Sequence, residues 1–129
     1  MRQGGCFCGF VRYVAEGPPS QQTNCHCSIC RRVSGAAVVA WFTVPSSGFR
    51  FVAGQASGFA SSDHGSRTFC PRCGTPLTFR SRHLPDAVDV TTCSLDDPAA
   101  LPPRDHTQTS SKLPWVALDD LPAFPQGRP

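Results

Sequence analysis

The chain has 129 residues, which fits one domain, and its hydrophobic fraction of 40% is ordinary for a globular fold. Charged residues reach only 16%, and 11 glycines and 13 prolines predict many turns and little long helix. No segment approaches the roughly 18 apolar residues of a membrane span, and the first residues lack the apolar core of a secretory signal. We therefore expect a soluble, cytoplasmic protein, whose 8 cysteines bind metal rather than form disulfides.

The formal net charge is +3, but it depends on the state of the cysteines. If seven of the cysteines were ionised, they would add seven negative charges, and two bound zinc ions would add four positive ones. The formal charge of +3 would then fall to zero. The basic residues are spread along the chain, and Arg31 and Arg32 form their only adjacent pair. A nucleic-acid partner is therefore not expected.

The predicted elements are mostly short strands. The segment 10–16 alternates imperfectly between apolar and polar residues, which predicts a half-buried strand, and 28–35 predicts a helix of about two turns. The run "AAVVAWFTV" at 36–44 is rich in β-branched and aromatic residues and predicts a central strand that ends at Pro45. Further short strands are predicted at 49–54, 59–62, 66–70, 76–80 and 86–93.

The last quarter of the chain has a different composition. Ser94 is a plausible N-cap for a second short helix over 94–101. Six prolines follow Leu101 and predict an extended C-terminal arm. The predicted fold is thus a mainly β single domain, with a domain at 2–124 and a tail at 125–129.

Seven of the cysteines fall into three tight motifs. They are C-x-C (Cys6, Cys8), C-x-C-x-x-C (Cys25, Cys27, Cys30) and C-x-x-C (Cys70, Cys73). Two residues apart in an extended segment, Cα atoms lie about 6.5 Å apart, near the upper limit for a disulfide. A tetrahedral zinc shell needs sulfur atoms only about 3.7 Å apart, so these motifs suit metal better.

The simplest grouping of the motifs gives two zinc sites. Cys6 and Cys8 would join Cys70 and Cys73 in a closed four-thiol structural site. Cys25, Cys27 and Cys30 would then form a shell with an open fourth position, which is the pattern of a reactive zinc.

Three alternatives stay open for the second site. Cys93 could supply a fourth thiolate and close it, although a buried small hydrophobe is the commoner interpretation of such a cysteine. His26 could ligate, but in an extended segment its ring points away from Cys25 and Cys27. The three thiols could also bind no metal and act as a redox cluster.

The motifs "GGCFCG", "NCHCSICRRVSG", "FCPRCGTPL", "SLDDP" and "H…SSKLPW…DDLPAF" occur in the order known from one family. From about Arg2 to Phe124 the chain resembles the glutathione-dependent formaldehyde-activating enzymes, a family that includes centromere protein V. Ala36, Ala37 and Cys93 depart from the family pattern, and none of them belongs to the three cysteine motifs.

The resemblance implies a mostly β fold like that of a small Rab-binding zinc chaperone. It implies a structural zinc on Cys6, Cys8, Cys70 and Cys73 and a catalytic zinc on Cys25, Cys27 and Cys30. It also implies a carbon–sulfur lyase type of enzyme, which joins glutathione and formaldehyde into S-(hydroxymethyl)glutathione.

We expect the thiol, rather than the aldehyde, to take the open zinc position, because three thiolates leave the site formally at −1 and weaken its Lewis acidity. Arg31 and Arg32 are candidates for holding the carboxylates of glutathione. His106 is a weaker candidate for moving a proton. Trp41, Phe42 and Trp115 could line a pocket, although core packing is the expected role of Trp41 and Phe42.

The alternative function is a non-catalytic, zinc-stabilised binding module for a protein or nucleic-acid partner. It predicts two closed metal sites and no thiol binding. Neither the sequence nor the resemblance fixes the oligomeric state, and a homodimer stays an open option.

Overall fold

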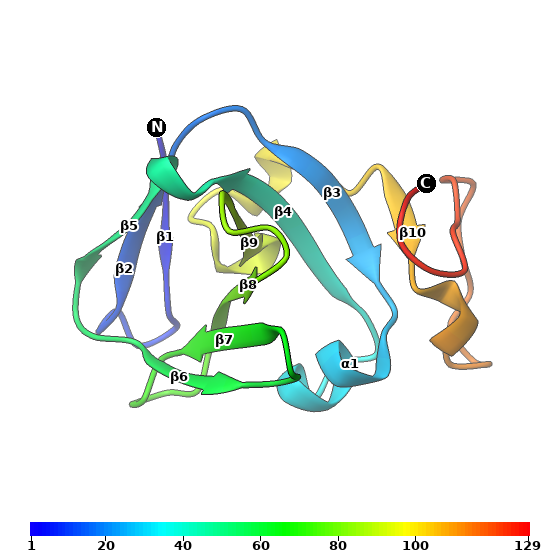
Figure 1. Ribbon diagram of the computed structural model, residues 1–129, viewed down its shortest axis with the longest axis horizontal. Helices are drawn as coiled ribbons and strands as arrows, with labels where there is room; N and C mark the ends of the chain where they lie inside the picture. Colours follow the sequence, from blue (N-terminus) through cyan, green and yellow to red (C-terminus); the bar gives the residue numbers. More distant parts are fainter.

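The computed structural model describes residues 1–129 and consists of two β-sheets and one short α-helix (Figure 1). The smaller sheet has three antiparallel strands in the order β1-β2-β5. These are β1 (Arg2–Gly5), β2 (Arg12–Ala15) and β5 (Phe49–Ala53). The helix α1 (Ser28–Ser34) lies at the lower edge of the view.

The larger sheet has seven strands in the order β10-β3-β4-β9-β8-β7-β6. All neighbours in it are antiparallel except β10, which pairs in parallel with β3. Its strands are β3 (Ser20–Cys25), β4 (Val39–Pro45), β6 (Ser57–Ala60), β7 (Gly65–Phe69), β8 (Pro76–Ser81), β9 (Ala87–Thr91) and β10 (Asp105–Thr107).

The main hydrophobic core joins the two sheets. It holds 13 buried residues, and Tyr13 of β2, Phe42 of β4 and Leu77 of β8 are among its fully buried side chains. Two further members are the thiols Cys6 and Cys70, from segments far apart in the sequence. A metal bound by these cysteines would therefore cross-link two distant segments of the chain within the core.

Most of the predicted strands are present, and the chain is mainly β, as predicted. The predicted helix over 28–35 is confirmed as α1. The predicted helix over 94–101 is wrong, because two separate 3₁₀ turns, Thr92–Ser94 and Pro98–Ala100, occupy this stretch. Pro98 explains the difference: a proline disfavours helical backbone in the residue before it, and Asp97 has φ −123° and ψ 78°.

Three strands, β1, β3 and β10, were not expected. The most informative is β3, whose sequence "SQQTNC" contains almost no apolar residue. It is nevertheless an interior strand, hydrogen-bonded to β4 on one side and β10 on the other. The same polar face lines a pocket described below, so its composition serves a site rather than the core.

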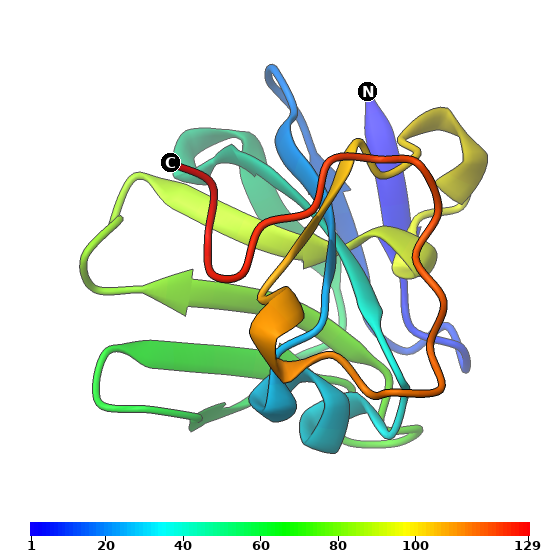
Figure 2. The same cartoon turned by 90° about the vertical axis from the view of Figure 1, so that its right-hand side faces the viewer.

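The chain after β10 turns at Thr109–Ser111 and returns along β10. The N–H of Phe124 donates to the carbonyl of His106 over 2.8 Å, and the N–H of His106 donates to the carbonyl of Pro122 over 2.8 Å. Figure 2 shows this orange and red segment crossing one side of the molecule in front of β3 and α1. None of the helices has the length and apolar character needed to cross a membrane.

Candidate metal centres

The structure brings Cys6, Cys8, Cys70 and Cys73 together. Their four sulfur atoms all lie within 4.8 Å of one another. The Cys6 and Cys8 sulfurs are 3.6 Å apart, and those of Cys8 and Cys70 are 3.8 Å apart. A disulfide would need about 2.05 Å, whereas a tetrahedral zinc shell needs about 3.7 Å between sulfurs. The donor set and its spacing thus fit a closed zinc site, which we call the four-thiol centre.

Two tight loops position these thiols, and each ends in a glycine of positive φ. Gly9 follows Cys8 with φ 83°, and Gly74 follows Cys73 with φ 84°. The turns direct backbone N–H groups at sulfur, as in the contact from Arg72 N to Cys70 Sγ over 3.3 Å. Such contacts stabilise thiolates.

Cys25, Cys27 and Cys30 form a second group, the three-thiol centre, with all three sulfurs within 4.8 Å. Cys25 is the last residue of β3, and Cys30 lies in the first turn of α1. Cys27 is the N-cap of α1, where its sulfur accepts the N–H of Cys30 over 3.2 Å. The change from strand to helix thus folds the three side chains toward one point.

In the three-thiol centre the first negative charge resides on Cys27, and the hydrogen bond to Cys27 raises the pKa of the Cys25 thiol. Hydrogen bonds from the Cys25 and Cys30 thiols lower the pKa of the Cys27 thiol, with smaller contributions from the Cys30 N–H and the charge of Arg67. Three soft sulfur donors suit zinc, which takes thiolate ligands readily. The group therefore fits zinc with three protein ligands.

The two predicted candidates for a fourth ligand lie elsewhere. His26 is buried, and its Nε2 contacts Nδ1 of His106 over 3.0 Å, so its ring points away from the thiols as the strand geometry predicts. Cys93 is exposed in a 3₁₀ turn and belongs to neither thiol group. The interpretation of Cys93 as a buried hydrophobe is wrong.

A large pocket with a volume of about 660 Å³ opens onto the three-thiol centre. Its floor is one face of the larger sheet, on which register pairs Arg67 with Phe79, Phe79 with Asp89 and Asp89 with Thr43. Paired residues on neighbouring strands share a face of the sheet, so this row crosses four strands. The pocket is also lined by Thr23, Trp41 and Thr107.

Asp89 is the acidic side chain of this pocket floor. Thr43 donates its hydroxyl to Asp89 Oδ1 over 2.6 Å. Burial raises the pKa of the Asp89 carboxyl, against the opposing effects of the Thr43 hydrogen bond and the Arg67 charge. Asp89 is thus suited to exchange a proton with a bound molecule nearer neutral pH than an exposed carboxylate.

Arg67 of β7 is the residue that the sequence analysis missed. Its guanidinium lies 3.7 Å (Nη1) and 3.6 Å (Nη2) from the sulfur of Cys30, and its Nε donates to the hydroxyl of Ser61 over 2.9 Å. The signal was present in the sequence: in "GSRTF" the alternation of β7 turns Gly65 and Arg67 inward, and a charged residue at an inward position is rare.

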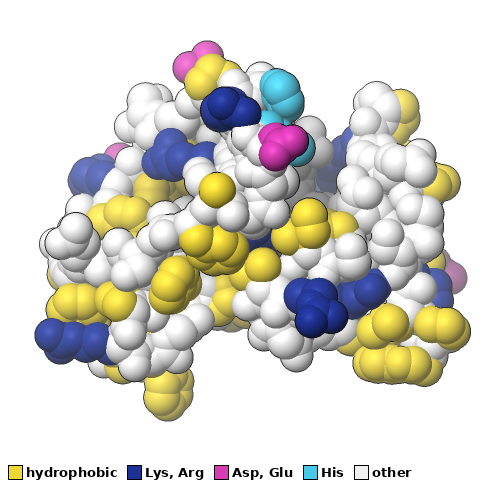
Figure 3. Space-filling model, turned by 60° about the horizontal axis from the view of Figure 1, so that its bottom comes forward, with side chains coloured by type: hydrophobic (Ala, Val, Ile, Leu, Met, Phe, Trp, Pro, Cys, Tyr) yellow, Lys and Arg dark blue, Asp and Glu magenta, His cyan; other side chains and the backbone are white.

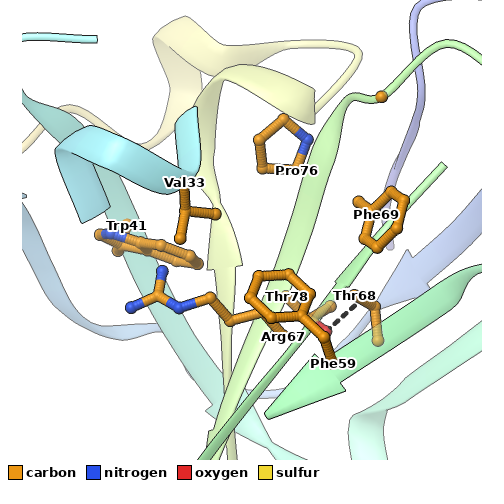
Figure 4. A pocket seen from close by; sticks show the side chains of 9 residues that line it. Val33, Trp41, Phe59, Arg67, Thr68, Phe69, Pro76 and Thr78 are labelled. Carbon is orange, nitrogen blue, oxygen red and sulfur yellow. Dashed lines mark hydrogen bonds between the residues drawn. The ribbon is translucent and has the colours of Figure 1, made fainter. Parts of the chain in front are cut away.

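Arg67 and Trp41 also line a second, smaller cavity of about 230 Å³, shown in Figure 4. The Arg67 side chain extends toward the Trp41 ring, and Phe59 and Phe69 lie on the side of the cavity formed by β6 and β7. The hydroxyls of Thr68 and Thr78 hydrogen-bond to each other over 2.6 Å. Apolar and aromatic side chains thus make up part of the surroundings of the Arg67 cation.

The predicted substrate arginines lie outside both cavities. Arg31 donates from Nη1 to the backbone carbonyls of His26 (3.3 Å) and Ser111, which ties α1 to the C-terminal segment. Arg32 is exposed. Their contact with a substrate stays a prediction. Figure 3 shows that basic side chains on the face it views are scattered among hydrophobic ones.

The remaining aromatic candidates have separate places. Phe42 is fully buried in the main core, which confirms core packing. Trp41 lines both cavities, so its ring belongs to the site as well as to the small cluster around Cys25 and Cys30. Trp115 is 74% exposed.

His106 belongs to a hydrogen-bonded chain that runs from the exposed Asp119 to two buried histidine rings. Its Nε2 donates to Oδ1 of Asp119 over 2.8 Å, so its Nδ1 accepts from Nε2 of His26 at 3.0 Å. Burial lowers the pKa of His26, with smaller effects from neighbouring cations, so a neutral ring is favoured. The chain connects the C-terminal segment to the residue between Cys25 and Cys27.

Replacing His106 by alanine will lower the free energy of unfolding by about 1–3 kcal/mol, because the buried His26 loses its partner. Urea denaturation of the zinc-loaded protein measures the change. His83→Ala removes an exposed histidine and should have no such effect. Equal free energies of unfolding for His106→Ala and His83→Ala would show that the hydrogen bonds of His106 do not hold the C-terminal segment in place.

Comparison with known proteins identifies the family of the chain. A curated protein of Halomonas elongata, named "Putative glutathione-dependent formaldehyde-activating enzyme", is 29% identical over 128 residues, which cover 92% of this chain and 82% of that protein. A crystal structure of a Rhodobacter sphaeroides protein matches the fold with a TM-score of 0.61 at 24% identity, over 94% of this chain and 98% of that one. The model of the family "Glutathione-dependent formaldehyde-activating enzyme" matches residues 1–111. With this match across most of its length, the chain belongs to the glutathione-dependent formaldehyde-activating enzyme family.

Proposed function

We propose that the protein joins a thiol, with glutathione as the first candidate, to formaldehyde or a related small aldehyde, as a carbon–sulfur lyase type of enzyme. The observation that carries the proposal is the pocket of about 660 Å³ that opens onto three grouped thiols. A fully ligated structural site would need no cavity of this size. The family match and the name of the Halomonas elongata relative support the same chemistry.

Each thiol group would hold one zinc ion. In this proposal Cys6, Cys8, Cys70 and Cys73 form the structural site, and Cys25, Cys27 and Cys30 form the catalytic one. When bound at the three-thiol centre, zinc would offer a coordination position that stabilises a substrate thiolate. The binding-module alternative instead needs a fourth ligand at this centre, and the exposure of Cys93 speaks against that closure.

A side chain of the pocket would accept the thiol proton and donate it to the product. In the reaction the S–H bond of the thiol breaks, a carbon–sulfur bond forms, and the carbonyl oxygen becomes a hydroxyl. Asp89 would accept the thiol proton and return it to that oxygen, while Thr43 holds Oδ1 of the carboxylate in place. The sheet face that carries Asp89 and Trp41 would orient the substrate in the pocket.

Thiols add to formaldehyde without an enzyme, so a test must compare the exchange rate with the protein to the exchange rate in buffer. Exchange NMR with ¹³C-labelled formaldehyde and glutathione measures both rates at equilibrium. We expect the zinc-loaded protein to speed the exchange above the rate in buffer, and chelation of zinc from the three-thiol centre to abolish the gain. S-methylglutathione, which has no thiol, should show no exchange into a sulfur-bound hydroxymethyl group. An exchange rate equal to that in buffer would contradict the proposed function.

A further inference from the structure

Arg67 is a buried cation without a carboxylate partner. Its residue is only 6% exposed, and it takes part in none of the protein's ion pairs. Taking a lone charge out of water costs several kcal/mol unless an opposite charge compensates it. Asp89 lies on the same sheet face and feels the charge of Arg67, but it forms no ion pair with it. Because both terminal nitrogens of Arg67 point at the Cys30 sulfur, the nearest compensating charge is that of the three-thiol centre.

The guanidinium is held firmly in this position. Ser61 accepts from Nε, and the guanidinium carbon lies 4.9 Å from the centre of the Phe79 ring and 5.8 Å from that of Trp41. A cation over aromatic faces is favourable, and a planar fork anchored at Nε has little freedom to turn. The strand position and three contacts therefore fix where the positive charge lies.

The charge of the site decides which ligand it can accept. Three thiolates around Zn²⁺ carry a formal charge of −1, which would repel a fourth thiolate. The charge of Arg67 brings the centre to zero, so that an incoming thiolate gives a total of −1 instead of −2. Because the site is partly buried, this difference is screened less than it would be at the surface.

We propose that Arg67 is a positioning residue that allows the three-thiol centre to bind a thiolate substrate. It does so by supplying the positive charge that the metal and its three thiolates lack. This inference rests on the proposed function and adds the residue that makes a thiolate an acceptable fourth ligand. Arg67, which does not bind the metal itself, would make the centre prefer a thiolate over a neutral molecule.

Cobalt substitution gives a readout that is independent of turnover. In protein loaded with Co²⁺, a thiolate entering the three-thiol centre adds a sulfur-to-cobalt charge-transfer band, and titration with glutathione yields its Kd. We expect Arg67→Met, which keeps the contacts with Trp41 and Phe79 but not the charge, to weaken glutathione binding at least about 30-fold. Arg67→Lys should recover part of the affinity, because it restores the charge without the fork.

Ser61→Ala provides a second variant, which keeps the charge and frees the guanidinium from its anchor. We expect about 5-fold weaker binding, which corresponds to the loss of one hydrogen bond. Equal glutathione affinity in wild type and Arg67→Met would overturn the inference, as would an undiminished affinity in Ser61→Ala if Arg67→Met fails to fold. If wild type itself gives no charge-transfer change with glutathione, the proposed function fails.

Discussion

Replacing Cys70 by serine will leave the chain without a cooperative folded state. Cys70 is fully buried, and its sulfur belongs both to the main core and to the four-thiol centre. A structural zinc site contributes on the order of 10 kcal/mol, which is comparable to the whole stability of a domain, about 5–15 kcal/mol. Circular dichroism during heating measures the loss, because the variant should show no sharp transition.

Cys93→Ser is the matched control for this experiment. Cys93 is exposed and lies outside both thiol groups, so the substitution should leave the melting temperature unchanged. A Cys70→Ser protein that melts cooperatively within a few degrees of wild type would show that the four-thiol centre does not hold the core together.

Replacing Cys27 by serine will lower the catalytic rate at least about 100-fold while the fold remains. Loss of an outer-shell partner of a metal ligand already costs about 10–100-fold, and here a ligand itself is removed. The fold survives for a local reason: the side chain of Cys27 caps α1 by accepting the N–H of Cys30, and serine is a preferred N-cap residue. Exchange NMR gives the rate, and thermal melting checks the fold.

Cys27→Ala separates the two roles of this residue. It should lose activity to the same extent and, in addition, about 1 kcal/mol of stability, because alanine cannot cap the helix. Wild-type activity in Cys27→Ser would remove this cysteine from the catalytic centre. Unfolding of the same variant would instead assign a structural role to the three-thiol centre.

The thiol groups were predictable from the sequence because their geometry is local. The side chains of residues two or three apart in a strand, a turn or the start of a helix can adopt few relative positions. The spacing of the cysteines alone therefore favoured metal binding over disulfides. The grouping of the first and third motifs also agrees with the structure. The direction of His26 followed from the same reasoning, since β3 is extended up to Cys25.

The pocket could not be predicted in this way, because pairing between distant strands forms it. Arg67, Phe79 and Asp89 become neighbours only through the register of β7, β8 and β9. The strand β3 was missed for a related reason, since its polar side chains face the pocket and hide the apolar alternation that marks a strand. The helix expected at 94–101 failed because the effect of Pro98 on Asp97 outweighed the capping signal at Ser94.

We propose that the chain carries two separable metal centres, of which only the four-thiol centre is needed for folding. The most direct test is the zinc content per chain of wild type and Cys27→Ser, both purified without chelator, together with their melting curves. We expect two zinc ions in wild type and one in Cys27→Ser, with both proteins folded. Loss of both ions or of the folded state in Cys27→Ser would contradict it.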